Sequence, residues 1–216
     1  MLLYLTRHGE TIWNTEGRVQ GRKNSDLTQK GIKQAEALKL RFENIKFDKI
    51  YSSPSERALI TAKTIVGDKP IIIDERLLEM GMGVWEGLKS SYLQERFPDE
   101  YKTYWEVPHL IKIEGMESIE ELLNRTREFI SDVVKSGVEN ALIISHGVTL
   151  KAIMHIWGNG STEKFWENGF FKQTSVSIVK CDENLNGEII AAYDTSHLSE
   201  EEISHFKVFS PPVQKS

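Results

Sequence analysis

The sequence lacks the features that mark secreted, membrane-spanning and nucleic-acid-binding proteins. Its 216 residues include one cysteine, Cys181, which cannot close an intramolecular disulfide, so we expect a protein of the reducing cytoplasm. No stretch approaches the roughly 18 consecutive apolar residues of a membrane span, so we expect no membrane partner. The formal net charge is −5, whereas a general binder of nucleic acids carries a positive balance, so we expect no nucleic-acid partner.

Short motifs that hold nucleotides or metal ions are also missing. Neither the Gly-x-x-x-x-Gly-Lys-Ser/Thr loop nor the Gly-x-Gly-x-x-Gly turn occurs, and there is no Cys-x-x-Cys or His-x-His pair. We therefore predict no metal site and no cofactor. Because the net charge is negative, any site for an anion must be built locally by a few basic side chains.

Apolar segments typical of strands alternate along the chain with amphipathic segments typical of helices. This alternation predicts an α/β fold with a mostly parallel sheet and helices on both faces. The expected strands are 2–6, 48–52, 70–74, 141–145, 175–180 and 188–193. Asn186-Gly187 is a hairpin signal between the last two, so we expect an antiparallel strand at one edge. No linker or repeat divides the chain, so we predict one domain over residues 1–216.

Helix signals are clearest at two positions. Thr28 can cap a helix that runs toward Phe42, and Ser118 can cap another, with Glu121 at capping-box spacing. We expect a further helix to follow Pro54 and one to follow the strand 141–145.

Residues 88–116 interrupt the alternation with aromatic side chains and two prolines. We predict a helical insertion that lies over one end of the sheet, as a lid above a ligand site, because ligands of such folds bind beyond the carboxyl ends of the strands. The aromatic side chains of 92–105 have helical spacing, so we expect them mainly in the core.

Chemically, the most informative stretch is Arg7-His8-Gly9-Glu10-Thr11, directly after the first predicted strand. An arginine fork can hold two oxygens of a phosphoryl group at once, and a histidine ring nitrogen can attack phosphorus. Asn14 adds a neutral donor, and Arg57, after Ser53-Pro54, a second guanidinium.

Two more candidates come later in the chain. Glu79 is an acid in an otherwise apolar loop, which suits a general acid, whereas pairing with Arg76 is the alternative. His146-Gly147 ends the strand 141–145, so His8 and His146 face each other if these two strands are neighbours. We interpret Glu86 as structural.

Together these motifs resemble the histidine phosphatase superfamily, also called the phosphoglycerate mutase-like family. The resemblance extends through 27–35, Ser52-Ser53-Pro54 with Arg57, 78–87 and 144–147, in family order. It implies a three-layer α/β/α sandwich and a metal-independent phosphomonoester hydrolase that acts through a phosphohistidine on small phosphorylated metabolites.

Residue roles are also implied by the resemblance. His8 is then the nucleophile, Glu79 the proton donor, and Arg7, Arg57 and His146 hold the phosphoryl oxygens. The implied substrate-binding residues are Asn14, Gln20, Gly21 and Gly147.

Alternatives within the family stay open. A cofactor-dependent phosphoglycerate mutase usually has an adjacent arginine pair in its insertion, and residues 88–116 contain none, which favours hydrolysis. A non-catalytic phosphate-binding member is the other alternative, although the expected nucleophile and arginines are all present. A homodimer is left open.

Overall fold

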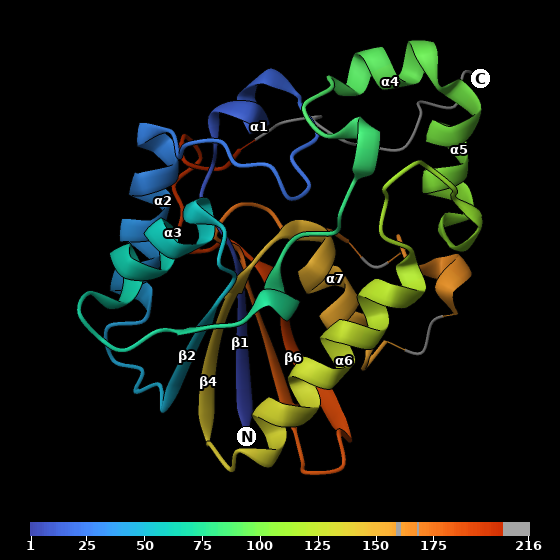
Figure 1. Cartoon of the computed structure of the whole chain (residues 1–216). Helices are drawn as coiled ribbons and strands as arrows, with labels where there is room; N and C mark the ends of the chain where they lie inside the picture. The colour runs from blue at the N-terminus through green and yellow to red at the C-terminus, as the bar shows by residue number, and fades with distance from the viewer. Residues whose placement is uncertain (159–160, 168, 205–216) are drawn as a thin grey trace.

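In the computed structural model, a six-stranded sheet lies at the centre of the fold, and its two central strands are direct neighbours (Figure 1). The structure describes residues 1–158, 161–167 and 169–204. The strands are β1 (Leu2–Arg7), β2 (Lys49–Ser52), β3 (Ile72–Ile73), β4 (Asn140–Ser145), β5 (Val176–Cys181) and β6 (Gly187–Asp194), in the order β3-β2-β4-β1-β5-β6.

Strand directions divide the sheet into two parts. β1, β2, β3 and β4 are mutually parallel, whereas β5 pairs antiparallel with β1 and β6 pairs antiparallel with β5. The mostly parallel sheet with antiparallel pairing at one edge is therefore confirmed. The third strand is shorter than the predicted 70–74 because Asp74 turns the chain into a 3₁₀ helix by accepting a hydrogen bond from the amide of Arg76.

Helices cover both faces of the sheet. The α-helices are α1 (Ile12–Glu16), α2 (Gln29–Arg41), α3 (Glu56–Val66), α4 (Ser90–Arg96), α5 (Pro98–Glu106), α6 (Ile119–Lys135) and α7 (Gly147–His155). Short 3₁₀ helices are η1 (Glu75–Leu77), η2 (Gly83–Trp85), η3 (Pro108–Leu110) and η4 (Thr162–Lys164). None of the helices in the described ranges is both long and apolar enough to cross a membrane.

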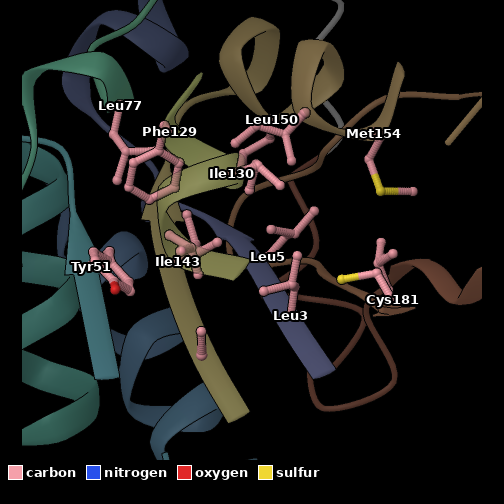
Figure 2. Close-up of a cluster of buried hydrophobic side chains, with 14 of the residues drawn as sticks. Leu3, Leu5, Tyr51, Leu77, Phe129, Ile130, Ile143, Leu150, Met154 and Cys181 are labelled. Atoms are coloured by element: carbon pink, nitrogen blue, oxygen red, sulfur yellow. The ribbon is translucent and has the colours of Figure 1, made fainter. Parts of the chain in front are cut away.

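Apolar side chains explain this layering. Alternate residues of the central strands point to opposite faces. Leu3, Leu5 and Ile143 point toward α6 and α7 (Figure 2), where they pack with Phe129 and Leu150. The residues between them in the strands pack against α2 and α3 in a second buried cluster, which holds Tyr4, Leu142, Ile144, Ala35, Leu38, Ala58 and Ala62. The predicted three-layer sandwich is thus confirmed.

The predicted helix caps are in place. The Thr28 side chain accepts a hydrogen bond from the Gly31 amide at the start of α2. Ser118 and Glu121 form the reciprocal capping box of α6. The expected helix after β4 is also present and begins at Gly147, directly after His146, which has the extended backbone of a cap.

The segment 88–116 forms α4, α5 and η3 near the carboxyl ends of the parallel strands (Figure 1). Its buried aromatic rings, Tyr101, Tyr104 and Trp105, pack with Trp85 and Phe165 in a third apolar cluster. That this segment acts as a lid, and that 1–216 is one domain, stay predictions; residues 205–216 lie outside the described residues.

Candidate active site

The site begins where the two central strands end. Because Arg7 of β1 is in register with Ser145 of β4, the residues that follow each strand are neighbours. The rings of His8 and His146 lie with centroids 5.2 Å apart and planes at 60°. Their predicted juxtaposition is therefore present.

The His8 ring is held in one orientation by a backbone hydrogen bond. Its Nδ1 lies 2.7 Å from the Gly9 carbonyl oxygen, which can only accept, so the proton is on Nδ1 and Nε2 carries the free lone pair. Burial first, and then the charges of Arg57 and Arg7, hold the pKa of His8 well below its usual value. The ring is therefore neutral, and Nε2 available, at neutral pH.

The loop that follows β1 packs closely against α2 at two glycines, Gly9 in the loop and Gly31 in the helix. A Cβ placed on Gly31 would lie 2.1 Å from the Glu10 carbonyl oxygen, and one on Gly9 would lie 2.4 Å from the Gly31 carbonyl oxygen. Only glycine permits so close an approach. The carboxylate of Glu10 adds polar links, since it accepts hydrogen bonds from the hydroxyls of Thr28 and Ser204, each at 2.8 Å.

Arg57 is a buried cation in the first turn of α3, with 1% of its surface exposed. It donates to the carbonyl oxygens of Lys23 at 2.8 Å and Gly21 at 2.9 Å, which fixes the guanidinium against the loop 20–24. Burial lowers its pKa to about 10, so it stays charged at neutral pH. No ion pair of Arg57 occurs within the described ranges.

Arg7 supplies the second guanidinium. Its Nη1 donates to the Phe171 carbonyl oxygen at 2.9 Å. The Nε atoms of Arg7 and Arg57 are both buried without a hydrogen-bond partner in the part of the chain that the structure describes. Buried donors of this kind are costly unless something pairs with them. Both arginines also line the cavity described below, so they bring positive charge to it, which favours an anion.

Glu79 is held at the start of α7. Its Oε1 accepts from the Met80 amide at 2.9 Å, the Thr149 amide at 3.0 Å and the Thr149 hydroxyl at 3.1 Å, and its Oε2 accepts from the Val148 amide at 3.2 Å. The alternative pairing with Arg76 does not occur, because that arginine binds Asp74 and Asp132.

Glu86, the nearby acid in the sequence, has a structural role as expected. Its Oε1 accepts from the amides of Arg22 and Met82, and it does not line the cavity described below.

His146 lies behind His8 with no exposed surface. Its Nε2 is 2.8 Å from the Ser53 hydroxyl oxygen, and its Nδ1 has no hydrogen-bond partner among the described residues. Burial, followed by the charge of Arg57, holds its pKa well below the usual value. The ring is adjacent to that of His8 but does not line the cavity.

The four predicted substrate-binding residues all line the same cavity. Asn14 uses its Oδ1 to accept from the Thr11 amide, and Gln20 donates through its Nε2 to the Thr11 hydroxyl at 2.6 Å. The Oε1 of Gln20 is buried without a partner within the described ranges. Gly21 contributes the carbonyl that holds Arg57, and Gly147 begins α7.

These groups meet in a cavity of about 510 Å³, a size typical of small-molecule sites. His8, Arg7, Arg57 and Glu79 line one part of it. Residues outside the predicted site also line it: Val148, Trp166, Phe170, Phe171, Lys172, Gln173 and Ser204, together with Arg18, Val19, Met82, Tyr104 and Trp105. These residues lie outside the polar motifs of the sequence, and they reach the cavity only through the fold.

No group of three or more His, Cys, Asp or Glu side chains that could hold a metal ion occurs among the residues that the structure describes.

Comparisons with known proteins agree with this arrangement. A family model described as histidine phosphatase superfamily (branch 1) matches residues 3–190. Phosphoserine phosphatase 1 of Hydrogenobacter thermophilus is 32% identical over 201 residues, which cover 92% of this chain and 94% of that protein. The solved structure of Bacillus stearothermophilus YhfR superposes with a TM-score of 0.86 at 36% identity and covers 91% of this chain and 98% of its own.

A phosphoserine phosphatase from Entamoeba histolytica, solved in complex with 3-phosphoglyceric acid, superposes with a TM-score of 0.80 at 28% identity. The match covers 92% of this chain and 99% of that one.

Proposed function

This chain belongs to the histidine phosphatase superfamily and is a phosphomonoesterase, and from that premise we propose that it cleaves small phosphate esters through a phosphohistidine formed on His8. The observation that carries the proposal is the neutral His8 ring in one cavity with two guanidinium groups, each of which has a buried Nε without a partner among the described residues. That combination suits a nucleophile facing a phosphoryl dianion.

In the first step, His8 Nε2 attacks phosphorus while the bond from phosphorus to the ester oxygen breaks. Arg7 and Arg57 stabilise the charge on the phosphoryl oxygens, while His146, whose Nε2 contacts the Ser53 hydroxyl, packs behind the His8 ring. The Glu79 carboxyl group gives its proton to the departing oxygen, so the product leaves as an alcohol.

In the second step, water attacks the phosphohistidine. The Glu79 carboxylate takes one proton from that water, the bond from phosphorus to His8 Nε2 breaks, and inorganic phosphate leaves. The site returns to its starting state, because Glu79 regains the proton that it donated and His8 Nε2 regains its lone pair. Asn14, Gln20, Gly21 and Gly147 help to bind the phosphoryl group.

We propose hydrolysis and not mutase transfer as the main reaction, because the segment 88–116 has no adjacent arginine pair and the relative matched over nearly the whole chain is a phosphatase. With 3-phosphoglycerate as substrate, release of inorganic phosphate supports this choice, whereas formation of 2-phosphoglycerate contradicts it.

The test of the mechanism is trapping of the covalent intermediate. Wild-type protein mixed with a ³²P-labelled ester in EDTA should retain acid-labile label, and His8→Ala should retain none and turn over no ester. His109→Ala removes an exposed histidine away from the cavity and serves as the matched control. Substantial turnover by His8→Ala would exclude the phosphohistidine route.

A further inference from the structure

An aromatic wall forms one side of the cavity. We define it as Tyr104, Trp105, Trp166 and Phe170, all of which line the cavity. Trp166 lies at its centre, with ring centroids 4.9 Å from both Tyr104 and Trp105. Phe170 stacks on Trp166 at 5.9 Å with planes 25° apart. The rings thus form one continuous surface drawn from two distant parts of the chain.

Polar contacts hold this wall in place before any ligand arrives. The Trp166 indole donates to the Tyr104 carbonyl oxygen at 2.5 Å. The buried ammonium of Lys151, on α7, donates to the carbonyl oxygens of Glu167 and Gly169 and lies 5.3 Å from the centre of the Phe170 ring. The wall is therefore preformed, so a ligand need not spend binding energy on ordering it.

The wall is joined directly to the phosphate end. Arg7 donates to the carbonyl oxygen of Phe171, the residue that follows Phe170. Although it packs against Trp166, Phe170 keeps 44% of its surface exposed, whereas Trp105 keeps 7%. An ester whose phosphoryl group lies between Arg7 and His8 would therefore extend its other half along an open apolar face.

Charge in the cavity also limits what that other half can be. Within the part of the chain that the structure describes, Glu79 is the sole carboxylate that lines the cavity. The proposed mechanism uses it for proton transfer at the ester oxygen. An amino-acid leaving group such as serine would bring an ammonium that no other carboxylate of the cavity receives, whereas the cations Arg18 and Lys172 line the cavity and would attract only its carboxylate.

Resting on the proposed function, we propose that the aromatic wall is the leaving-group subsite and selects phosphate monoesters of aromatic or bulky apolar alcohols over esters of short polar alcohols. The selectivity comes from apolar surface removed from water and from ring contacts with Phe170 and Trp166.

The test compares 2-phenylethyl phosphate with propyl phosphate, because both are esters of primary alkyl alcohols and differ little in leaving-group basicity. We expect kcat/KM to be at least about tenfold higher for the phenylethyl ester. In Phe170→Ala, this ratio should fall by roughly three- to tenfold. Tyr92→Ala is the matched control, since Tyr92 is an aromatic residue with 45% exposure outside the cavity, and its ratio should not change.

Binding without turnover separates this inference from the proposed function. Competitive inhibition by 2-phenylethylphosphonate, measured against propylphosphonate, should show the same preference and the same loss in Phe170→Ala. Equal constants for the two phosphonates, or a higher kcat/KM for O-phosphoserine than for 2-phenylethyl phosphate, would overturn the subsite while leaving a phosphatase. If the phosphonates differ as expected but no ester is hydrolysed, the subsite stands and the proposed reaction fails.

Discussion

Glu79→Gln separates proton donation by this residue from its part in shaping the site. The three donors that meet Oε1, from Met80 and Thr149, can still bind the oxygen of a glutamine. Only the longer contact, from the Val148 amide to Oε2 at 3.2 Å, is lost when an amide nitrogen takes that place. We therefore expect the side chain to keep its position and the free energy of unfolding to fall by only about 1 kcal/mol.

The chemical cost should be far larger and should depend on the ester. An alkoxide is a poor leaving group unless it is protonated as its bond breaks, and positioned acid catalysis contributes about 10²–10⁴-fold. Glu79→Gln should slow the phosphorylation of His8 by at least about 100-fold with an alkyl phosphate, and much less with p-nitrophenyl phosphate, whose leaving group needs the proton less.

Single-turnover kinetics is the appropriate assay, because later activation of water by the same residue would slow both esters alike. Glu86→Gln is the matched control: its carboxylate also accepts from backbone amides but lies outside the cavity, so it should show no dependence on the ester. An equal loss of phosphorylation rate for both esters in Glu79→Gln would refute proton donation and leave Glu79 a positioning role.

Three further predictions concern the arginine fork, the nucleophile and the glycine contact. Arg57→Lys should lower kcat/KM by about 10²–10³-fold, because a lysine cannot reproduce the two-pronged guanidinium group. The exposed Arg96→Lys is the control and should have no effect. Near-normal activity of Arg57→Lys would contradict the placement of Arg57 at the phosphoryl group. Because its pKa is held well below 6.5, the His8 ring should stay neutral at pH 6 in an NMR titration and protonate only as the pH falls further; a pKa of 6.5 or above contradicts the burial argument. Gly31→Ala should lower the free energy of unfolding by roughly 1–3 kcal/mol in denaturant titrations, although alanine has a better helix propensity than glycine. Gly158→Ala is the control: its added carbon would lie 3.6 Å from the nearest neighbouring atom, so its free energy of unfolding should hardly change.

The sequence predicted those features that depend on local patterns. Thr28 and Ser118 cap helices as expected, because a cap needs only a side-chain oxygen and the next few amides. The meeting of His8 and His146 was also predictable, since parallel neighbouring strands bring their carboxyl ends to one edge of the sheet. Their roles in the reaction stay proposals.

Features that depend on distant contacts could not be predicted in this way. The short helix α1 was missed, because its five residues have no apolar period and its signal is a capping box between Thr11 and Asn14. Phe170 lies beside Trp105 only because a long segment returns to the site after α7. The spacing of the aromatic residues 92–105 correctly placed Tyr104 and Trp105 in the core, but it carried no information that they also line the cavity.

The central position of β1 has a consequence for synthesis on the ribosome. This strand, which places His8, is synthesised before its hydrogen-bonding partners β4 and β5, which begin more than 130 residues later in the chain. At about 5–20 residues per second, the apolar strand waits roughly 7 to 26 s for the first of them. During that time Leu3 and Leu5 have no sheet to pack into, so the nascent chain exposes an unpaired, aggregation-prone strand. Slower translation between residues 7 and 140 should therefore favour aggregation, whereas a chaperone that covers the first strand should raise the yield of folded enzyme.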